Sequence, residues 1–130
     1  MRVMIDTNVL ISAVIKEGSV PDQVVLNVLK NHELILCKQI VKECIEVTER
    51  RFPDKKSQMD IMLKLLPIEL VEGPSHDFIK INDLKDQPIV NAALHNNIDV
   101  LVTGDKHFFE FKCPDLFICT PSAYLAKFGK

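Results

Sequence analysis

RVMIDTNVLISA, residues 2–13, is the stretch that decides the fold. Its apolar start, which ends at Ile5, predicts a short β-strand. The residues from about Asn8 to Ile15 are apolar on nearly all sides, which is typical of a buried helix. A carboxylate, Asp6, lies at the junction of the two, and Thr7 is expected to contribute to the turn. Because ligands of open α/β sheets collect beyond the carboxyl ends of the strands, we expect Asp6 to take part in the chemistry.

Strands and helices alternate along the remainder of the chain. Further strands are predicted at residues 34–36, 68–71, 99–103 and 116–119, and helices at 19–31, 38–52, 54–66, 86–96 and from 121 onward. Ser19, with Pro21 and Asp22 after it, resembles a capping box at the start of the second helix. This alternation predicts an α/β fold with a mainly parallel sheet of four to five strands sandwiched by helices. We expect residues 1–130 to form a single domain.

Composition excludes several classes of protein. No apolar stretch approaches the roughly 20 residues that span a bilayer, and Asp6 interrupts the apolar run that a signal peptide would need. We therefore expect a soluble, cytoplasmic protein without a membrane partner. The four cysteines form no C-x-x-C pair, which favours reduced thiols over zinc ligands or disulfides. The net charge of −2 means that any nucleic acid would have to be held locally.

The predicted helix over residues 38–52 offers several glutamates, of which one fits an enclosed site. The helical period centres the apolar face near Cys44 and places Glu43 at its margin. Glu46 and Glu49 point well away from that face, as solvated charges do. Glu43 is therefore the candidate.

Four acidic residues converge on one edge of the predicted sheet. Asp6 and Asp105 end predicted strands, Asp86 begins the helix that leads into the strand before Asp105, and Glu43 lies early in a helix that follows a strand. Right-handed connections would bring all four to the same edge. Each also has a simpler interpretation, since Asp6 and Asp86 could be helix caps, Asp105 a turn residue and Glu43 a surface charge.

Clustered carboxylates raise one another's pKa unless a cation neutralises them. Oxygen ligands favour Mg²⁺ or Mn²⁺ over zinc. Ions held in this way activate a bound water and stabilise the attacking and leaving oxygens of an in-line phosphoryl displacement. Ser12, Ser122 and the cysteines have no setting that would make them nucleophiles, so hydrolysis by a metal-activated water is the chemistry that the residues indicate.

Four segments taken in order, Met4 to Leu10, Glu43, Asp86 to Ala93 and Leu101 to Lys106, resemble a PIN domain. The resemblance implies a three-layer α/β/α fold and a metal-dependent ribonuclease, and many small members, VapC-type proteins among them, are toxins of toxin–antitoxin pairs. Its metal-binding and catalytic set would be Asp6, Glu43, Asp86 and Asp105, with Asn8 and Thr103 as supporting polar groups.

The resemblance also implies partners, namely an RNA substrate, an antitoxin protein and a second copy of the chain in a homodimer. Two details stay open. Asp83 competes with Asp86 for the third acidic place, although the residues that follow Asp86 match the start of the family's helix. Lys106 or His107 either contacts a phosphate or is an exposed turn residue.

Two other functions compete with a nuclease. A PIN-like binding module without catalysis would act through RNA or protein partners and need bind no metal. A phosphotransfer enzyme or receiver domain also gathers aspartates at strand ends. However, Asn8 stands where dehalogenase-like phosphatases have a second aspartate, and the strand at 68–71 supplies no convincing phosphoacceptor.

Overall fold

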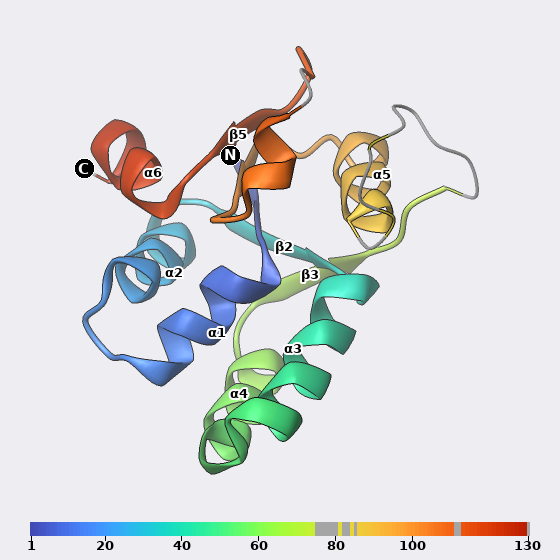
Figure 1. The fold of residues 1–130 in the computed structure, drawn as a ribbon. Helices are drawn as coiled ribbons and strands as arrows, with labels where there is room; N and C mark the ends of the chain where they lie inside the picture. The colour runs from blue at the N-terminus through green and yellow to red at the C-terminus, as the bar shows by residue number, and fades with distance from the viewer. Residues whose placement is uncertain (75–80, 82–83, 85, 111–112, 130) are drawn as a thin grey trace.

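The computed structural model describes residues 1–74, 81, 84, 86–110 and 113–129 (Figure 1). Its strands are β1 (Arg2–Ile5), β2 (Glu33–Cys37), β3 (Ile68–Val71), β4 (Val100–Val102) and β5 (Phe117–Cys119). They form one sheet in the order β3-β2-β1-β4-β5, and each neighbouring pair is parallel. The predicted parallel sheet is therefore confirmed.

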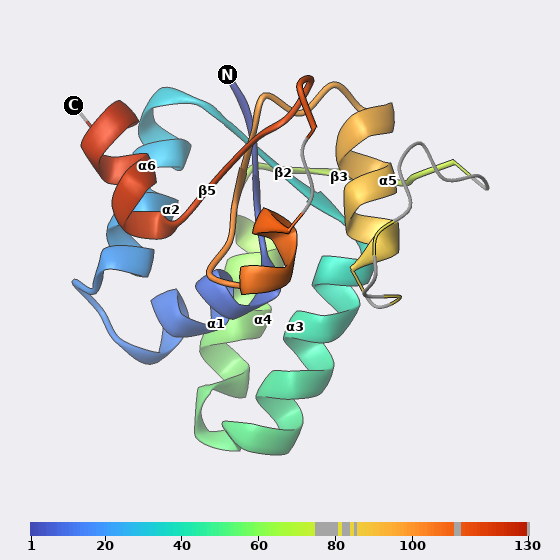
Figure 2. The same cartoon turned by 45° about the horizontal axis from the view of Figure 1, so that its top comes forward.

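Helices cover the sheet on both faces. They are α1 (Thr7–Ile15), α2 (Val20–Asn31), α3 (Lys38–Arg51), α4 (Lys56–Leu65), α5 (Gln87–His95) and α6 (Pro121–Phe128), with short 3₁₀ helices η1 (Pro53–Lys55) and η2 (Lys106–Phe109). Figure 1 shows α1 to α4 gathered on one side of the sheet and α5 on the other. In Figure 2 α6 lies beside α2, where the Tyr124 hydroxyl donates to Asn27 Oδ1 at 2.6 Å. This layered α/β arrangement agrees with the expected fold class.

The core is built around the central strands. Met4, Ile35 and Leu101, from three neighbouring strands, are fully buried, as expected for a parallel sheet covered on both faces. All four cysteines are free, as predicted. Within the described residues, no helix is both long enough and apolar enough to cross a membrane.

The junction of β1 and α1 follows from backbone hydrogen bonds of Asp6. Its N–H donates to Val102 O at 2.9 Å, which extends the pairing of β1 with β4, and its carbonyl accepts from Leu10 N at 3.2 Å, which begins the helix. Consequently α1 starts at Thr7, one residue before the predicted start. The predicted helix over 54–66 is also modified, because Pro53 opens the turn η1 and the regular helix α4 begins only at Lys56.

The strand order creates a switch point between β1 and β4. The chain leaves β1 through α1 toward β2 on one side, whereas β4 lies on the other side of β1 and is entered from α5. Connections that diverge in this way leave a crevice at the carboxyl ends of the two strands, which is where open α/β sheets bind ligands. Asp6 follows β1 at this point, and Thr103 and Asp105 follow β4.

Candidate active site

Asp6 is a buried carboxylate held by two hydrogen bonds. Its side chain is 4% exposed, Oδ1 accepts from the Thr7 backbone N–H at 2.8 Å, and Oδ2 accepts from Thr103 Oγ1 at 2.8 Å. Burial raises the pKa of Asp6 from 3.8 to about 6; the two hydrogen bonds oppose the rise, and the charges of Glu43 and Asp105 add to it. The ionised form of Asp6 is therefore destabilised, and a nearby cation would offset this cost.

Thr103 joins Asp6 to Asp105. The pairing of Ile5 with Val102 makes Asp6 and Thr103 the next residues in register, and Thr103 is completely buried. While its hydroxyl donates to Asp6, the same oxygen accepts from the Asp105 backbone N–H at 3.0 Å. Thr103 thus fixes the spacing of the two acidic residues, and a catalytic role for it stays a prediction.

Glu43 is half-buried on α3 and reaches the site through Thr7. Its Oε2 accepts from Thr7 Oγ1 at 3.0 Å, and its Oε1 accepts from Gln39 Nε2 at 2.7 Å. Glu46, by contrast, is exposed, and Glu49 is exposed and pairs with a lysine on α4. Among these glutamates, the helical period therefore selected the one that faces the acidic edge.

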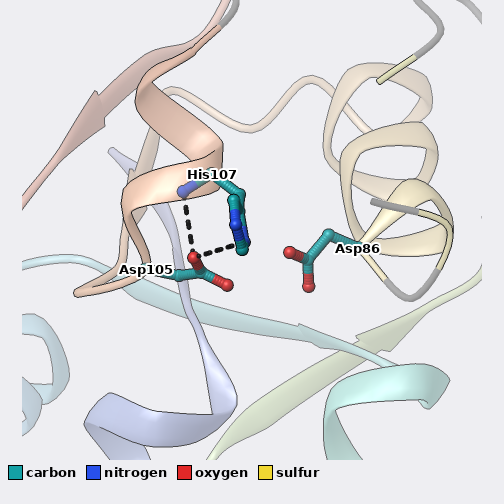
Figure 3. Close-up of side chains that lie close together, drawn as sticks. All are labelled: Asp86, Asp105 and His107. Atoms are coloured by element: carbon teal, nitrogen blue, oxygen red, sulfur yellow. Dashed lines mark hydrogen bonds and ion pairs between the residues drawn. The ribbon is translucent and has the colours of Figure 1, made fainter. Parts of the chain in front are cut away.

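Asp86, Asp105 and His107 meet across the space between α5 and η2 (Figure 3). One potential ligand atom from each residue lies within 4.8 Å of those from the other two. Asp105 Oδ1 accepts from the His107 backbone N–H at 2.9 Å and lies 3.1 Å from the ring nitrogen Nδ1. Asp86 is 8% exposed, and Asp105 is 26% exposed, so this group is more open to solvent on the η2 side.

The simpler interpretations of these aspartates hold only in part. Asp6 does bind a backbone N–H of the helix that follows it, and Asp105 does bind the N–H of His107 as turn aspartates do. Asp86 occupies the N-cap position of α5, but its side chain makes no capping hydrogen bond there. The Asp86 carboxylate faces Asp105 and η2 instead (Figure 3).

Asp83, the other candidate for the third acidic place, lies outside the described residues. Asn8, expected as a supporting group, is exposed on the first turn of α1, and its role stays a prediction. Sequence reasoning did not foresee that Thr7 and Gln39 both donate to Glu43. The position of Gln39 four residues before Glu43 was a usable signal, since such pairs are neighbours on a helix.

Comparison with known proteins identifies the family. The PIN domain family model matches residues 2–107. The chain belongs to the PIN domain family. It is 21% identical over 146 aligned positions to the uncharacterized protein MJ1680 of Methanocaldococcus jannaschii, covering all of this chain and 93% of that protein.

The PIN fold also appears in a solved structural neighbour. This is a chain in the crystal structure of VapBC2 from Rickettsia felis bound to a DNA fragment from their promoter. The two chains superpose with a TM-score of 0.68 at 19% identity, covering 92% of this chain and 98% of the neighbour. At this level of identity the likeness establishes the fold.

The residues of this PIN domain suit a divalent cation. PIN domains are generally nucleases, and such nucleases typically use divalent metals. Asp6, Asp86 and Asp105 could supply carboxylate oxygens to Mg²⁺ or Mn²⁺, and His107 could supply a ring nitrogen. The imidazole is a softer ligand that suits transition metals better than Mg²⁺. The donor set therefore fits a divalent cation.

Proposed function

We propose that this PIN domain is a metal-dependent endoribonuclease that hydrolyses RNA phosphodiester bonds with an activated water. The observation that carries the proposal is the position of Asp105. Its charge raises the pKa of buried Asp6, and its side chain also lies within the group formed with Asp86 and His107. The Asp105 carboxylate thus lies near Asp6 as well as near Asp86 and His107. All four residues are at the switch point of the sheet, where substrate would bind.

Each residue of the acidic site would have a defined role in this activity. Asp6, Glu43, Asp86 and Asp105 would hold Mg²⁺ or Mn²⁺. Thr7 and Thr103 would orient them, because Thr7 bonds to both Asp6 and Glu43 and Thr103 bonds to both Asp6 and Asp105. A bound cation of this kind supplies an activated water and stabilises the charge of an in-line displacement at phosphorus.

Two residues of η2 are suited to the phosphate of the substrate. Lys106 is exposed one position after Asp105, and the His107 side chain is 57% exposed while its ring contacts Asp105. Both would lie beside a phosphate held at the acidic edge. A cation close to the carboxylates would offset the repulsion between an acidic site and an anionic substrate.

Metal-dependent cleavage of RNA by the purified protein tests the proposal. We expect cleavage with Mg²⁺ or Mn²⁺, none in EDTA, and a loss of at least a hundredfold in Asp105→Asn. Glu43→Gln and Glu46→Gln form a matched pair on α3, since only Glu43 contacts Thr7. Equal cleavage by both variants would contradict the assignment of Glu43. A protein that binds Mn²⁺ in a titration yet cleaves no RNA would instead favour the alternative of a non-catalytic binding module.

We further propose that the chain is the toxin of a toxin–antitoxin pair and forms a homodimer. The likeness to a chain of the VapBC2 structure supports the pairing with an antitoxin, and the homodimer is what the family resemblance implies. Expression of the chain alone should arrest growth of the host, Asp105→Asn should not, and light scattering should give twice the mass of the chain. Growth unaffected by the wild-type protein would favour a role in RNA processing.

We also propose that residues 1–130 act as one domain. The family match ends at residue 107, but β5 pairs in parallel with β4 and so completes the same sheet. Truncation after residue 110 should therefore abolish cooperative unfolding. A truncated protein that unfolds cooperatively would show that the C-terminal segment is dispensable.

A further inference from the structure

Two exposed apolar residues lie close in sequence to the group of Asp86, Asp105 and His107. Phe109 is 47% exposed and follows His107 by two positions, and Leu84 is 83% exposed and precedes Asp86 by two positions. Single exposed apolar residues are common on protein surfaces and need no function. These two differ because they stand on the two segments that present the acidic group.

The side chains of the short helix η2 point in different directions. Phe108 is completely buried and anchors the helix in the core, while the His107 ring lies against Asp105. A 3₁₀ helix has three residues per turn, so side chains three positions apart lie one above the other. Lys106 and Phe109 therefore share a face, and both are exposed. This face combines a cation and an aromatic ring next to the acidic site.

A cation and an aromatic ring on one face match the chemistry of a single nucleic-acid strand. Lysine attracts the phosphate backbone, and an aromatic ring stacks on a base of any sequence, since every base has a π-face. Bases inside a duplex are already stacked on one another and are not accessible to such a ring. The face therefore selects unpaired nucleotides over paired ones.

We propose that Phe109 is a stacking platform for an unpaired base beside the scissile phosphate, with Lys106 on the same face contacting the backbone. The inference rests on the proposed ribonuclease function and assigns two residues of η2 to the binding of a base and of the backbone beside the cleaved bond. Because Phe108 is completely buried, it anchors the backbone of η2 that carries Phe109.

Among the described residues, a second exposed phenylalanine provides a matched control. Phe117 is 43% exposed on β5, but the Lys127 ammonium lies 4.5 Å from the centre of its ring. Its exposure is thus close to that of Phe109, while it lies on a different element, with its ring face already covered by a cation. Removal of either ring deletes a comparable exposed apolar surface.

Fluorescence anisotropy with a short labelled single-stranded RNA tests the proposal. Binding is measured with Mg²⁺ in the Glu43→Gln background, which slows cleavage and leaves η2 unchanged. Base–aromatic stacking is worth about 1–3 kcal/mol, so Phe109→Ala should weaken binding about 5- to 150-fold. Phe109→Tyr and Phe117→Ala should bind within about twofold of the parent. An RNA with abasic sites should bind weakly and show no further loss in Phe109→Ala, because the stacking partner is absent.

Steady-state cleavage by the otherwise wild-type protein separates this inference from the proposed function. We expect Phe109→Ala to raise KM with little change in kcat, since Phe109 contacts a base and not the reacting phosphate. Three results would each overturn the stacking role while cleavage continues. Phe109→Ala could bind single-stranded RNA as tightly as its parent, Phe109→Ala and Phe117→Ala could lose the same amount of RNA affinity, or the protein could bind a duplex more tightly than a single strand. Absence of cleavage together with Phe109-dependent binding would overturn the nuclease and leave the platform in place.

Discussion

Replacement of Asp6 by asparagine should stabilise the protein while it abolishes cleavage. Burial raises the pKa of Asp6 from 3.8 to about 6, so keeping this side chain ionised at pH 7.5 costs about 3 kcal/mol. Asparagine keeps the acceptor for the Thr7 N–H but places an amide against Thr103 Oγ1, which must then accept instead of donate. We allow about 1 kcal/mol for that rearrangement. The variant should therefore gain about 1–2 kcal/mol in the free energy of unfolding without metal.

The gain in the free energy of unfolding of Asp6→Asn depends on pH. Because the folded-state pKa of Asp6 lies above its ordinary value, the folded protein binds the proton more tightly than the unfolded chain does. The stability contributed by Asp6 is therefore complete below about pH 4 and falls as the pH rises to about 6. Asp6→Asn lacks this titration, so its advantage should appear across that interval and remain constant above it.

Urea unfolding in EDTA at several pH values measures the effect, and Asp115→Asn, at an exposed position, is the control. Addition of Mg²⁺ or Mn²⁺ should then stabilise the wild-type protein by mass action and leave Asp6→Asn nearly unchanged. A variant that is less stable than the wild type in EDTA at pH 7.5, or that gains equally from metal, would refute the claim that Asp6 is held in a charged form for a cation.

Other contacts give further predictions. Thr103→Val should raise the pKa of Asp6 further, leave the Asp105 N–H without its acceptor and lower the free energy of unfolding by about 1–3 kcal/mol, whereas Thr103→Ser should restore most of the loss in urea denaturation. His107→Ala should weaken Mn²⁺ binding by about tenfold in calorimetry, as loss of a ligand or of its supporting contact does; unchanged Mn²⁺ affinity would leave His107 without a role in metal binding. Tyr124→Phe removes the hydrogen bond to Asn27 between α2 and α6 and should cost about 0.5–1.5 kcal/mol in thermal unfolding, with activity retained.

Much of the fold could be predicted because its signals are local. Apolar runs and helix-start residues lie next to one another in sequence, and Ser19 does cap α2 by accepting from the Asp22 N–H. The start of α1 was placed one residue late, because it depends on the Asp6 carbonyl and on pairing between β1 and the distant β4. Strand order depends on such long-range contacts, which no local pattern encodes.

In the candidate site, too, local patterns in the sequence predicted some features, while others depend on contacts between distant segments. The choice of Glu43 over Glu46 followed from the helical period, and Gln39 could have been found by its spacing from Glu43. The bridge from Thr7 to Glu43 requires α1 to pack against α3, and the meeting of Asp86 with His107 requires α5 to face η2. The order of strands and helices could therefore predict that the acidic residues share one edge of the sheet, but the individual contacts that depend on how the helices pack could not be predicted.

A crystal soaked in Mn²⁺ offers the most direct test of the account, because anomalous scattering locates the ion without reference to activity. We predict a Mn²⁺ peak at the carboxyl edge of β1 and β4, with oxygen ligands from Asp86 and Asp105 and with Asp6 within reach of the ion or of its water. At saturating Mn²⁺, absence of a peak there, or a peak bound only by residues elsewhere on the surface, would contradict the central claim that these carboxylates form a cation site.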